Sequence, residues 1–111
     1  MTTRDMVIET LLDHSLNRTG RGFFAAAELA GRFLDTDRGR DPIQLLEETA
    51  RHLGITRQKL EEQIRQFARY VKRRDPALYH KMTGTRFSLL QFIRGAADLA
   101  WDHYRDKHTL L

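Results

Sequence analysis

The segment from Leu46 to Arg65 has the spacing that most constrains how this chain folds. Ala50 lies four residues before Gly54, and apolar residues continue on both sides at helical spacing. A small residue lets two helices approach closely, and glycine tolerates the positive φ that a very short turn between them needs. The spacing therefore predicts a helix-turn-helix, with a purely structural helical corner as the alternative. The apolar side chains expected between its two helices are Leu53, Ile55, Leu60 and Ile64.

Helical periodicity covers almost the whole chain, and no alternating β-branched run indicates a strand. Only two prolines occur, and each follows an aspartate, as expected where aspartate caps a helix and proline takes its first position. We therefore expect an all-α, six-helix single domain over residues 1–111, with the helix-turn-helix at about 42–73. The expected helices span about 3–15, 23–34, 42–53, 57–73 and 76–81, and a last one runs from 85 or 88 to about 107.

The last helix is expected to contribute an apolar stripe to the core, and part of that stripe could instead form a dimer interface. The stripe consists of Phe87, Leu90, Ile93, Ala97, Ala100, Trp101 and Tyr104.

Composition excludes several classes of protein. The chain has no cysteine, which removes disulfides and thiolate metal sites. Its apolar runs are too short for a membrane span, and no signal-peptide pattern follows the N-terminus, so we expect a cytoplasmic protein without a membrane partner. The five histidines lack close metal-ligand spacing, the Asp98–Asp102 pair is typical of a solvated face, and no nucleophile motif occurs. We therefore predict no enzyme activity, catalytic residue, metal or cofactor.

Positive charge is concentrated in one stretch of the chain. Residues 56–74 contain seven Lys and Arg against two Glu, so this stretch has a net charge of +5. The whole chain has a net charge of +4, so the remaining residues together carry −1. One interpretation is a nucleic-acid-binding helix, and the other is a solvated helix whose basic C-terminus complements the helix dipole. RNA binding is the less favoured form of the first interpretation, because no interleaved aromatic residues flank this helix.

Docking geometry assigns roles to the second helix if the corner binds duplex DNA. Its first turn, after Thr56, would then face base edges in the major groove. Arg57 can bind guanine O6 and N7, and Gln58 can bind adenine N6 and N7. Glu61 and Glu62 repel phosphate but can accept from cytosine N4 or orient an arginine. The candidate DNA-binding residues here are Thr56, Arg57, Gln58, Lys59, Glu61, Glu62, Arg65 and Arg69.

Two of these assignments have alternatives, and one further segment is a candidate. Glu61 can instead form an i,i+4 ion pair with Arg65. His52 is expected at the surface or facing phosphate. The loop with Arg18 and Arg21 could add guanidinium and backbone N–H groups to phosphate binding, and a plain turn is its alternative.

These residues resemble the C-terminal DNA-binding domain of the bacterial master response regulator of sporulation initiation. The strongest stretch runs from Ala50 to Gln66, where Glu61, Ile64 and Arg65 match the family's Glu-x-x-Ile-Arg core. Weaker matches are Arg21-Gly22-Phe23 with Glu28, and Phe92-Ile93 with Ala97-Asp98. The resemblance implies a six-helix domain that binds promoter DNA, often as a tandem pair, and contacts RNA polymerase.

The chain also departs from that family. The receiver domain with its phosphorylated aspartate is absent from these 111 residues, so the chain is either a free-standing relative or a fragment. The turn reads Ile-Thr-Arg-Gln-Lys rather than Thr-Thr-x-Ser-Arg, so base specificity is not carried over. We expect a sequence-specific DNA-binding transcriptional regulator, which could act as a homodimer. The alternative is an adaptor of the same fold that binds a transcription partner, because two glutamates lie on the expected reading face.

Overall fold

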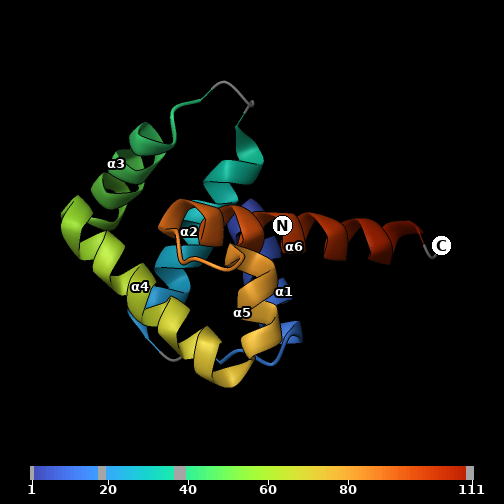
Figure 1. Cartoon of the computed structure of the whole chain (residues 1–111). Coiled ribbons are helices and arrows are strands. Elements are labelled where there is room, and N and C mark those ends of the chain that lie inside the picture. The colour runs from blue at the N-terminus through green and yellow to red at the C-terminus, as the bar shows by residue number, and fades with distance from the viewer. Residues whose placement is uncertain (1, 18–19, 37–39, 110–111) are drawn as a thin grey trace.

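The computed structural model describes residues 2–17, 20–36 and 40–109, and this part of the chain contains six helices and no strand. The all-α class is therefore confirmed (Figure 1). None of the described helices combines the length and apolar character that a membrane crossing requires. The helices are α1 (Thr3–Asp13), α2 (Arg21–Asp35), α3 (Pro42–Leu53), α4 (Arg57–Arg74), α5 (Pro76–Thr83) and α6 (Leu89–Thr109).

Side-chain caps fix where α3, α4 and α5 begin, as the sequence predicted. The Asp41 carboxylate accepts from the Ile43 N–H at 3.0 Å, and the Asp75 carboxylate accepts from the Leu78 N–H at 3.1 Å. The Thr56 hydroxyl accepts from the backbone N–H three residues later, also at 3.1 Å. Each cap satisfies a donor that the first helical turn leaves without an intrahelical partner. These three helix starts follow the sequence prediction closely.

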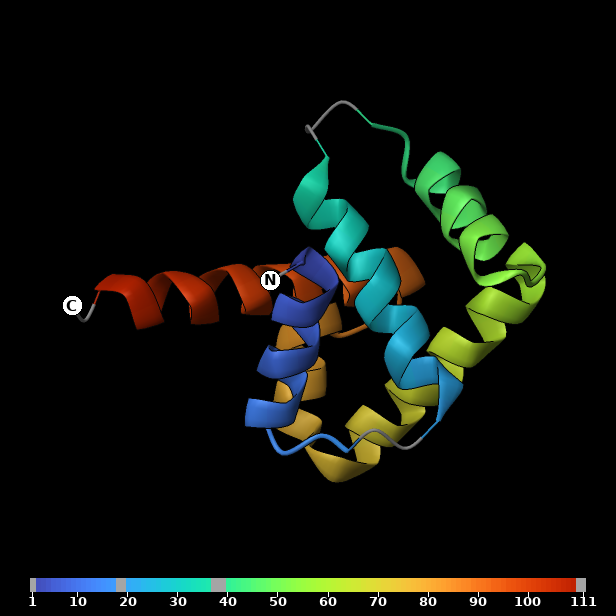
Figure 2. The same cartoon turned by 180° about the vertical axis from the view of Figure 1, so that it is seen from behind.

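Helix α2 packs against α1, α3, α4 and α6. Its buried positions are mostly small, so its neighbours can approach closely; at Gly31, a Cβ atom would lie 2.8 Å from the Arg4 backbone nitrogen. One cluster of buried side chains draws on all six described helices. Helices α3 and α4 form one edge of the molecule, and α6 extends beyond the other helices on the opposite side (Figures 1 and 2).

The expected apolar stripe of the last helix is only partly correct. Leu90 is partly buried, and Ile93, Ala97 and Ala100 are buried. However, Phe87, Trp101 and Tyr104 are 40%, 55% and 41% exposed, so their assignment to the core is wrong. Phe87 precedes the helix, which begins at Leu89, and the C-terminal half of α6 projects beyond the body (Figure 2). The helix instead also buries Phe92, Ala96 and Leu99.

Candidate nucleic-acid interface

A three-residue turn joins α3 to α4. Gly54 adopts the left-handed conformation with φ 70° and ψ 30°, as predicted, and its N–H donates to the Arg51 carbonyl oxygen at 3.2 Å. The Ile55 N–H donates to the Ala50 carbonyl oxygen at 3.0 Å. These bonds end α3, and Thr56 caps α4 immediately afterwards. The turn thus has the local geometry that the sequence predicted for this corner.

The side chains around the turn differ in their burial. Ala50, Leu60 and Ile64 are buried, as expected of residues between the helices. Leu53 is 38% exposed, and its predicted place between them is wrong. It lines a hollow of about 270 Å³ with Phe24, Ala25 and the partly buried Ile55, because α2 packs beside the turn. The sequence could not show this, because residues 24 and 53 are far apart in the chain.

Helix α4 has a buried face and a basic exposed face. The buried face is formed by Leu60, Ile64, Phe67, Ala68 and Val71. Residues three and four apart share one side of a helix, so another set lies together opposite that face. We call this set the α4 face; its members are all exposed, and they are Gln58, Glu62, Arg65, Arg69 and Arg73.

Of the predicted residues, Gln58, Glu62, Arg65 and Arg69 are therefore brought together on the α4 face. Arg73 was missed, although it continues the same spacing four residues after Arg69. The Glu62 carboxylate lies 3.7 Å from the Arg69 guanidinium, whereas Arg65 forms no ion pair with the described residues. The face thus retains a net positive charge along its C-terminal part. Lys59 is exposed beside it.

Arg57 and Glu61 lie at the edge of α4 that faces α3. The Arg57 guanidinium is 3.6 Å from the Glu47 carboxylate of α3 and 3.9 Å from the Glu61 carboxylate. Glu61 therefore pairs with Arg57, four residues before it, and the alternative pair with Arg65 does not form. Such exposed pairs contribute little to stability, so Arg57 can leave Glu47 for another partner at small cost.

Helix α2 begins beside the C-terminal half of α4. Arg21, its exposed first residue, lines a hollow of about 260 Å³ together with Gln66, Tyr70 and Arg73. The N-cap is Gly20, which provides no side-chain acceptor for the first backbone N–H groups. A helix N-terminus of this kind carries partial positive charge. Arg18, the other residue predicted in this loop, lies outside the described residues.

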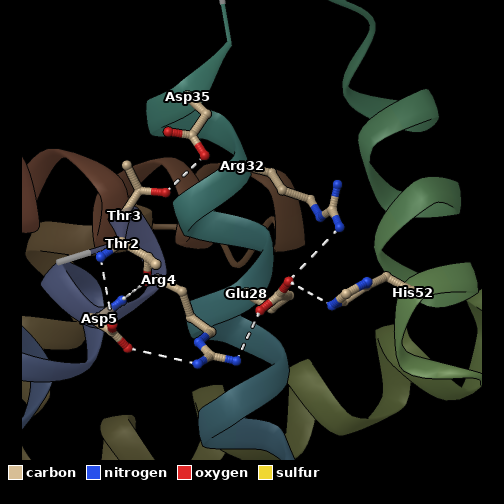
Figure 3. A network of polar contacts seen from close by, with 8 residues as sticks. All are labelled: Thr2, Thr3, Arg4, Asp5, Glu28, Arg32, Asp35 and His52. Carbon is tan, nitrogen blue, oxygen red and sulfur yellow. Dashed lines mark hydrogen bonds and ion pairs between the residues drawn. The ribbon is translucent and has the colours of Figure 1, made fainter.

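His52 is exposed, as predicted, and it also belongs to a polar network. Its Nε2 lies 3.4 Å from the Glu28 carboxylate, which also lies 3.7 Å from Arg4 and 3.8 Å from Arg32. Figure 3 shows the guanidinium groups of Arg4 and Arg32, from α1 and α2, and the imidazole of His52, from α3, converging on this carboxylate. The Glu28 side chain is only 13% exposed. The network connects α3 to α2, and sequence spacing gave no sign of it.

A second polar cluster holds α6 against α1. Glu9, Asp13 and His103 form the one group of three possible metal ligands among the described residues. The Lys107 ammonium contacts the carboxylates of Glu9 and Asp13, so one cation already offsets part of their charge. A hydrogen bond from His103, at 2.7 Å, lowers the pKa of Asp13, and the hydrogen bond to Glu9 raises the pKa of Lys107. The cluster therefore acts as an ion-pair clamp between two helices.

Aromatic side chains do flank α4 in space. Tyr79 of α5 and Phe87, which precedes α6, share a hollow with Arg65, Arg69 and Lys72. The expectation that no aromatic groups accompany the basic helix is therefore wrong. These aromatic residues follow α4 in the sequence and are brought back to it by the turn into α5 and by the segment before α6.

Comparisons with models of protein families, with curated proteins and with solved structures found no match to this chain. The resemblance to the sporulation regulator family therefore stays a prediction.

Proposed function

We propose that this chain binds duplex DNA through the α4 face and acts as a sequence-specific transcriptional regulator. The observation that carries the proposal is the line of Arg65, Arg69 and Arg73 on one exposed side of a helix whose opposite side is buried. Guanidinium groups bind phosphate through charge and hydrogen bonds, and phosphate contacts supply most of the non-specific affinity for DNA.

Base reading belongs to the N-terminal end of α4. Gln58 is exposed there and can bind adenine in the major groove. Arg57 reaches the same groove edge if it leaves Glu47, and it then selects guanine. Glu62, which lies one turn after Gln58, can accept from cytosine N4 or hold Arg69 in place. Specificity is thus assigned to Arg57 and Gln58, and positioning to the arginines further along the helix.

Phosphate contacts extend to the neighbouring helix. Arg21 lies beside Arg73 at the hollow where the N-terminus of α2 adjoins α4. The partial positive charge of a helix N-terminus favours an anion at this position. A DNA strand that follows the α4 face would therefore meet Arg21 at its end.

The test is selection of binding sites from a random duplex library with the full chain, followed by binding measurements on the selected site. We expect Gln58→Ala to lose about 1–3 kcal/mol of discrimination at one base position. Arg69→Ala should weaken all sequences by a similar factor. Lys81→Ala, which removes an exposed cation of α5, is the control and should change neither property.

The selected sequences also show how many copies bind. Two half-sites spaced by about one helical turn, roughly 10 base pairs, would indicate a homodimer, and a single half-site would indicate a monomer. Failure of the chain to bind any duplex at low salt would overturn the proposal.

An adaptor role is the second candidate, and the exposed apolar hollow beside the turn favours it. Phe24 and Leu53 line this hollow at 43% and 38% exposure. Apolar side chains exposed next to a basic helix are typical of a protein-binding surface. Binding of RNA polymerase or another transcription protein that survives nuclease treatment, and that Leu53→Ser abolishes, would support this role over DNA reading.

A further inference from the structure

Another hollow lies where α4 leads into α5 and where the segment before α6 comes back toward these helices (Figure 1). It has a volume of about 210 Å³, and we call it the α4–α5 hollow. It combines an aromatic wall with a cationic wall. Its lining residues are Arg65, Ala68, Arg69, Lys72, Tyr79 and Phe87.

The aromatic wall is formed by a stacked pair of rings. The rings of Tyr79 and Phe87 are nearly parallel, at 9°, with centroids 6.5 Å apart. Behind them, the buried Phe92 contacts both rings, with centroids 6.3 Å from Tyr79 and 6.2 Å from Phe87. The core thus fixes the orientation of the wall, while Phe87 keeps 40% of its surface exposed. A positioned and accessible ring is what a planar aromatic ligand needs for stacking.

The cationic wall comes from one side of α4. Arg65, Arg69 and Lys72 follow each other at i, i+4 and i+7, and the Lys72 ammonium lies 5.7 Å from the centroid of the Tyr79 ring. Arg69 has Glu62 as an ion-pair partner, whereas Arg65 and Lys72 have none among the described residues. Among the described residues, no carboxylate lines the hollow. Its described lining therefore presents positive charge directly beside the rings.

We propose that the α4–α5 hollow binds a nucleotide, with the base on Phe87 and the phosphate on Lys72 and Arg65. A phosphate alone would leave the aromatic wall without a role, and an apolar ligand would leave the cations without one. The two walls together match the base and phosphate of one nucleotide. The inference goes beyond duplex reading, because Tyr79 and Phe87 come from α5 and from the segment before α6, and Gln58 lies at the other end of α4.

Isothermal titration calorimetry with the full chain tests this site. We expect adenosine 5′-monophosphate to bind at least about tenfold more tightly than either adenosine or ribose 5-phosphate, since each lacks one of the two recognised groups. Ribose 5-phosphate that binds as tightly as the nucleotide, or no binding of any nucleotide probe at millimolar concentration, would overturn the proposal.

A short single-stranded oligonucleotide separates the two possible sources of the nucleotide. Tighter binding of the oligonucleotide than of the mononucleotide identifies an unpaired residue of a nucleic acid as the ligand, because neighbouring phosphates then add contacts along α4. If the oligonucleotide binds no more tightly per nucleotide than the mononucleotide does, the ligand is a free nucleotide. Both results support the site, and the mononucleotide comparison above decides whether it exists.

Two matched phenylalanine variants isolate the stacking contact. Phe87→Leu should weaken nucleotide binding about tenfold, and Phe87→Tyr, which keeps the ring, should retain it. Phe24→Leu is the control, because Phe24 has a similar exposure of 43% but lies on α2 and does not line the hollow. Equal losses in Phe87→Leu and Phe24→Leu, or no loss in Phe87→Leu when thermal unfolding shows it folded, would contradict the proposal.

The same variants distinguish this inference from the proposed DNA reading. Phe87→Leu should leave the affinity for the selected duplex unchanged, and Gln58→Ala should leave nucleotide binding unchanged. Lys72→Gln should weaken the nucleotide but not adenosine, because it removes only the phosphate contact. A Lys72→Gln variant that weakens adenosine equally would show that the lysine acts through the shape of the hollow instead.

Discussion

Gly22 lies where the first turn of α2 meets the backbone of α4. A Cβ atom at this position would be 2.3 Å from the Gln63 carbonyl oxygen and 3.0 Å from the Phe67 Cβ. Gly22→Ala must therefore push α2 away from α4, and we expect a loss of about 1–3 kcal/mol in the free energy of unfolding. Urea denaturation measures the loss. An unchanged or higher stability, as the better helix propensity of alanine alone would give, would contradict the close approach.

Single residues show what local chemistry in the sequence could and could not predict. The roles of Asp41, Gly54 and Thr56 depend only on their immediate neighbours, and the structure confirms all three. The close contact at Gly22 and the placement of His52 on Glu28 depend on segments distant in sequence. These contacts therefore could not be predicted from the sequence alone.

At the scale of elements, α3 is held by α2 and α4, and the Glu28 network is part of that attachment. Glu28→Gln removes the charge that Arg4, Arg32 and His52 share. We expect a loss of about 1 kcal/mol in unfolding free energy, a modest value because the cations are partly exposed. Glu47→Gln, at the exposed pair with Arg57, is the control and should cost almost nothing. Equal losses in the two variants would argue against the network as an anchor of α3.

The C-terminal half of α6 depends on its ion-pair clamp to α1. The lowered pKa of Asp13 means that its contribution is present above the ordinary value for aspartate, about 3.9, and is lost as pH falls through the lower folded value. The raised pKa of Lys107 means that its contribution is present below the ordinary lysine value, about 10.4, and is lost as pH rises through the higher folded value. The clamp should thus hold between these limits.

NMR secondary chemical shifts of residues 101–107 measure this prediction, with α4 as the internal reference. We expect helical shifts at neutral pH that decline in strong acid and in strong alkali. Lys107→Met should remove the alkaline decline, while Lys59→Met, at an exposed lysine of α4, should leave it unchanged. An alkaline transition that persists in Lys107→Met would assign the effect to another group.

The positions of the helices could be predicted from the sequence better than the contacts between them. Periodicity and caps located all six described helices, because both signals are local. Periodicity also predicted burial for Trp101 and Tyr104, and there it was wrong, because the C-terminal half of α6 projects beyond the other described helices (Figure 2) and meets α1 through the polar residues His103 and Lys107. Likewise, it could not show that Tyr79 and Phe87 return to the side of α4. Which face meets a neighbour is decided by the packing of the whole chain.

At the scale of the whole molecule, charge is separated between one helix and the remainder. Residues 56–74 carry +5 and the other residues together −1, so an approaching polyanion is attracted mainly to α4. If Arg65, Arg69, Arg73 and Arg21 each contact one phosphate, the slope of log affinity against log salt is roughly −3.6. Duplex affinity should then fall about a hundredfold between about 50 mM and about 200 mM salt.

Variants resolve that salt dependence into single contacts. Arg73→Ala should make the slope shallower by about one, because one phosphate fewer releases its counterion. Gln58→Ala should leave the slope unchanged and alter only the preferred sequence, since an amide to a base edge releases no counterion. Fluorescence anisotropy over a salt series with the selected duplex provides both numbers. A slope near zero, or equal slopes in the wild type and Arg73→Ala, would show that Arg65, Arg69 and Arg73 are not the source of the affinity. Either result would favour the adaptor role.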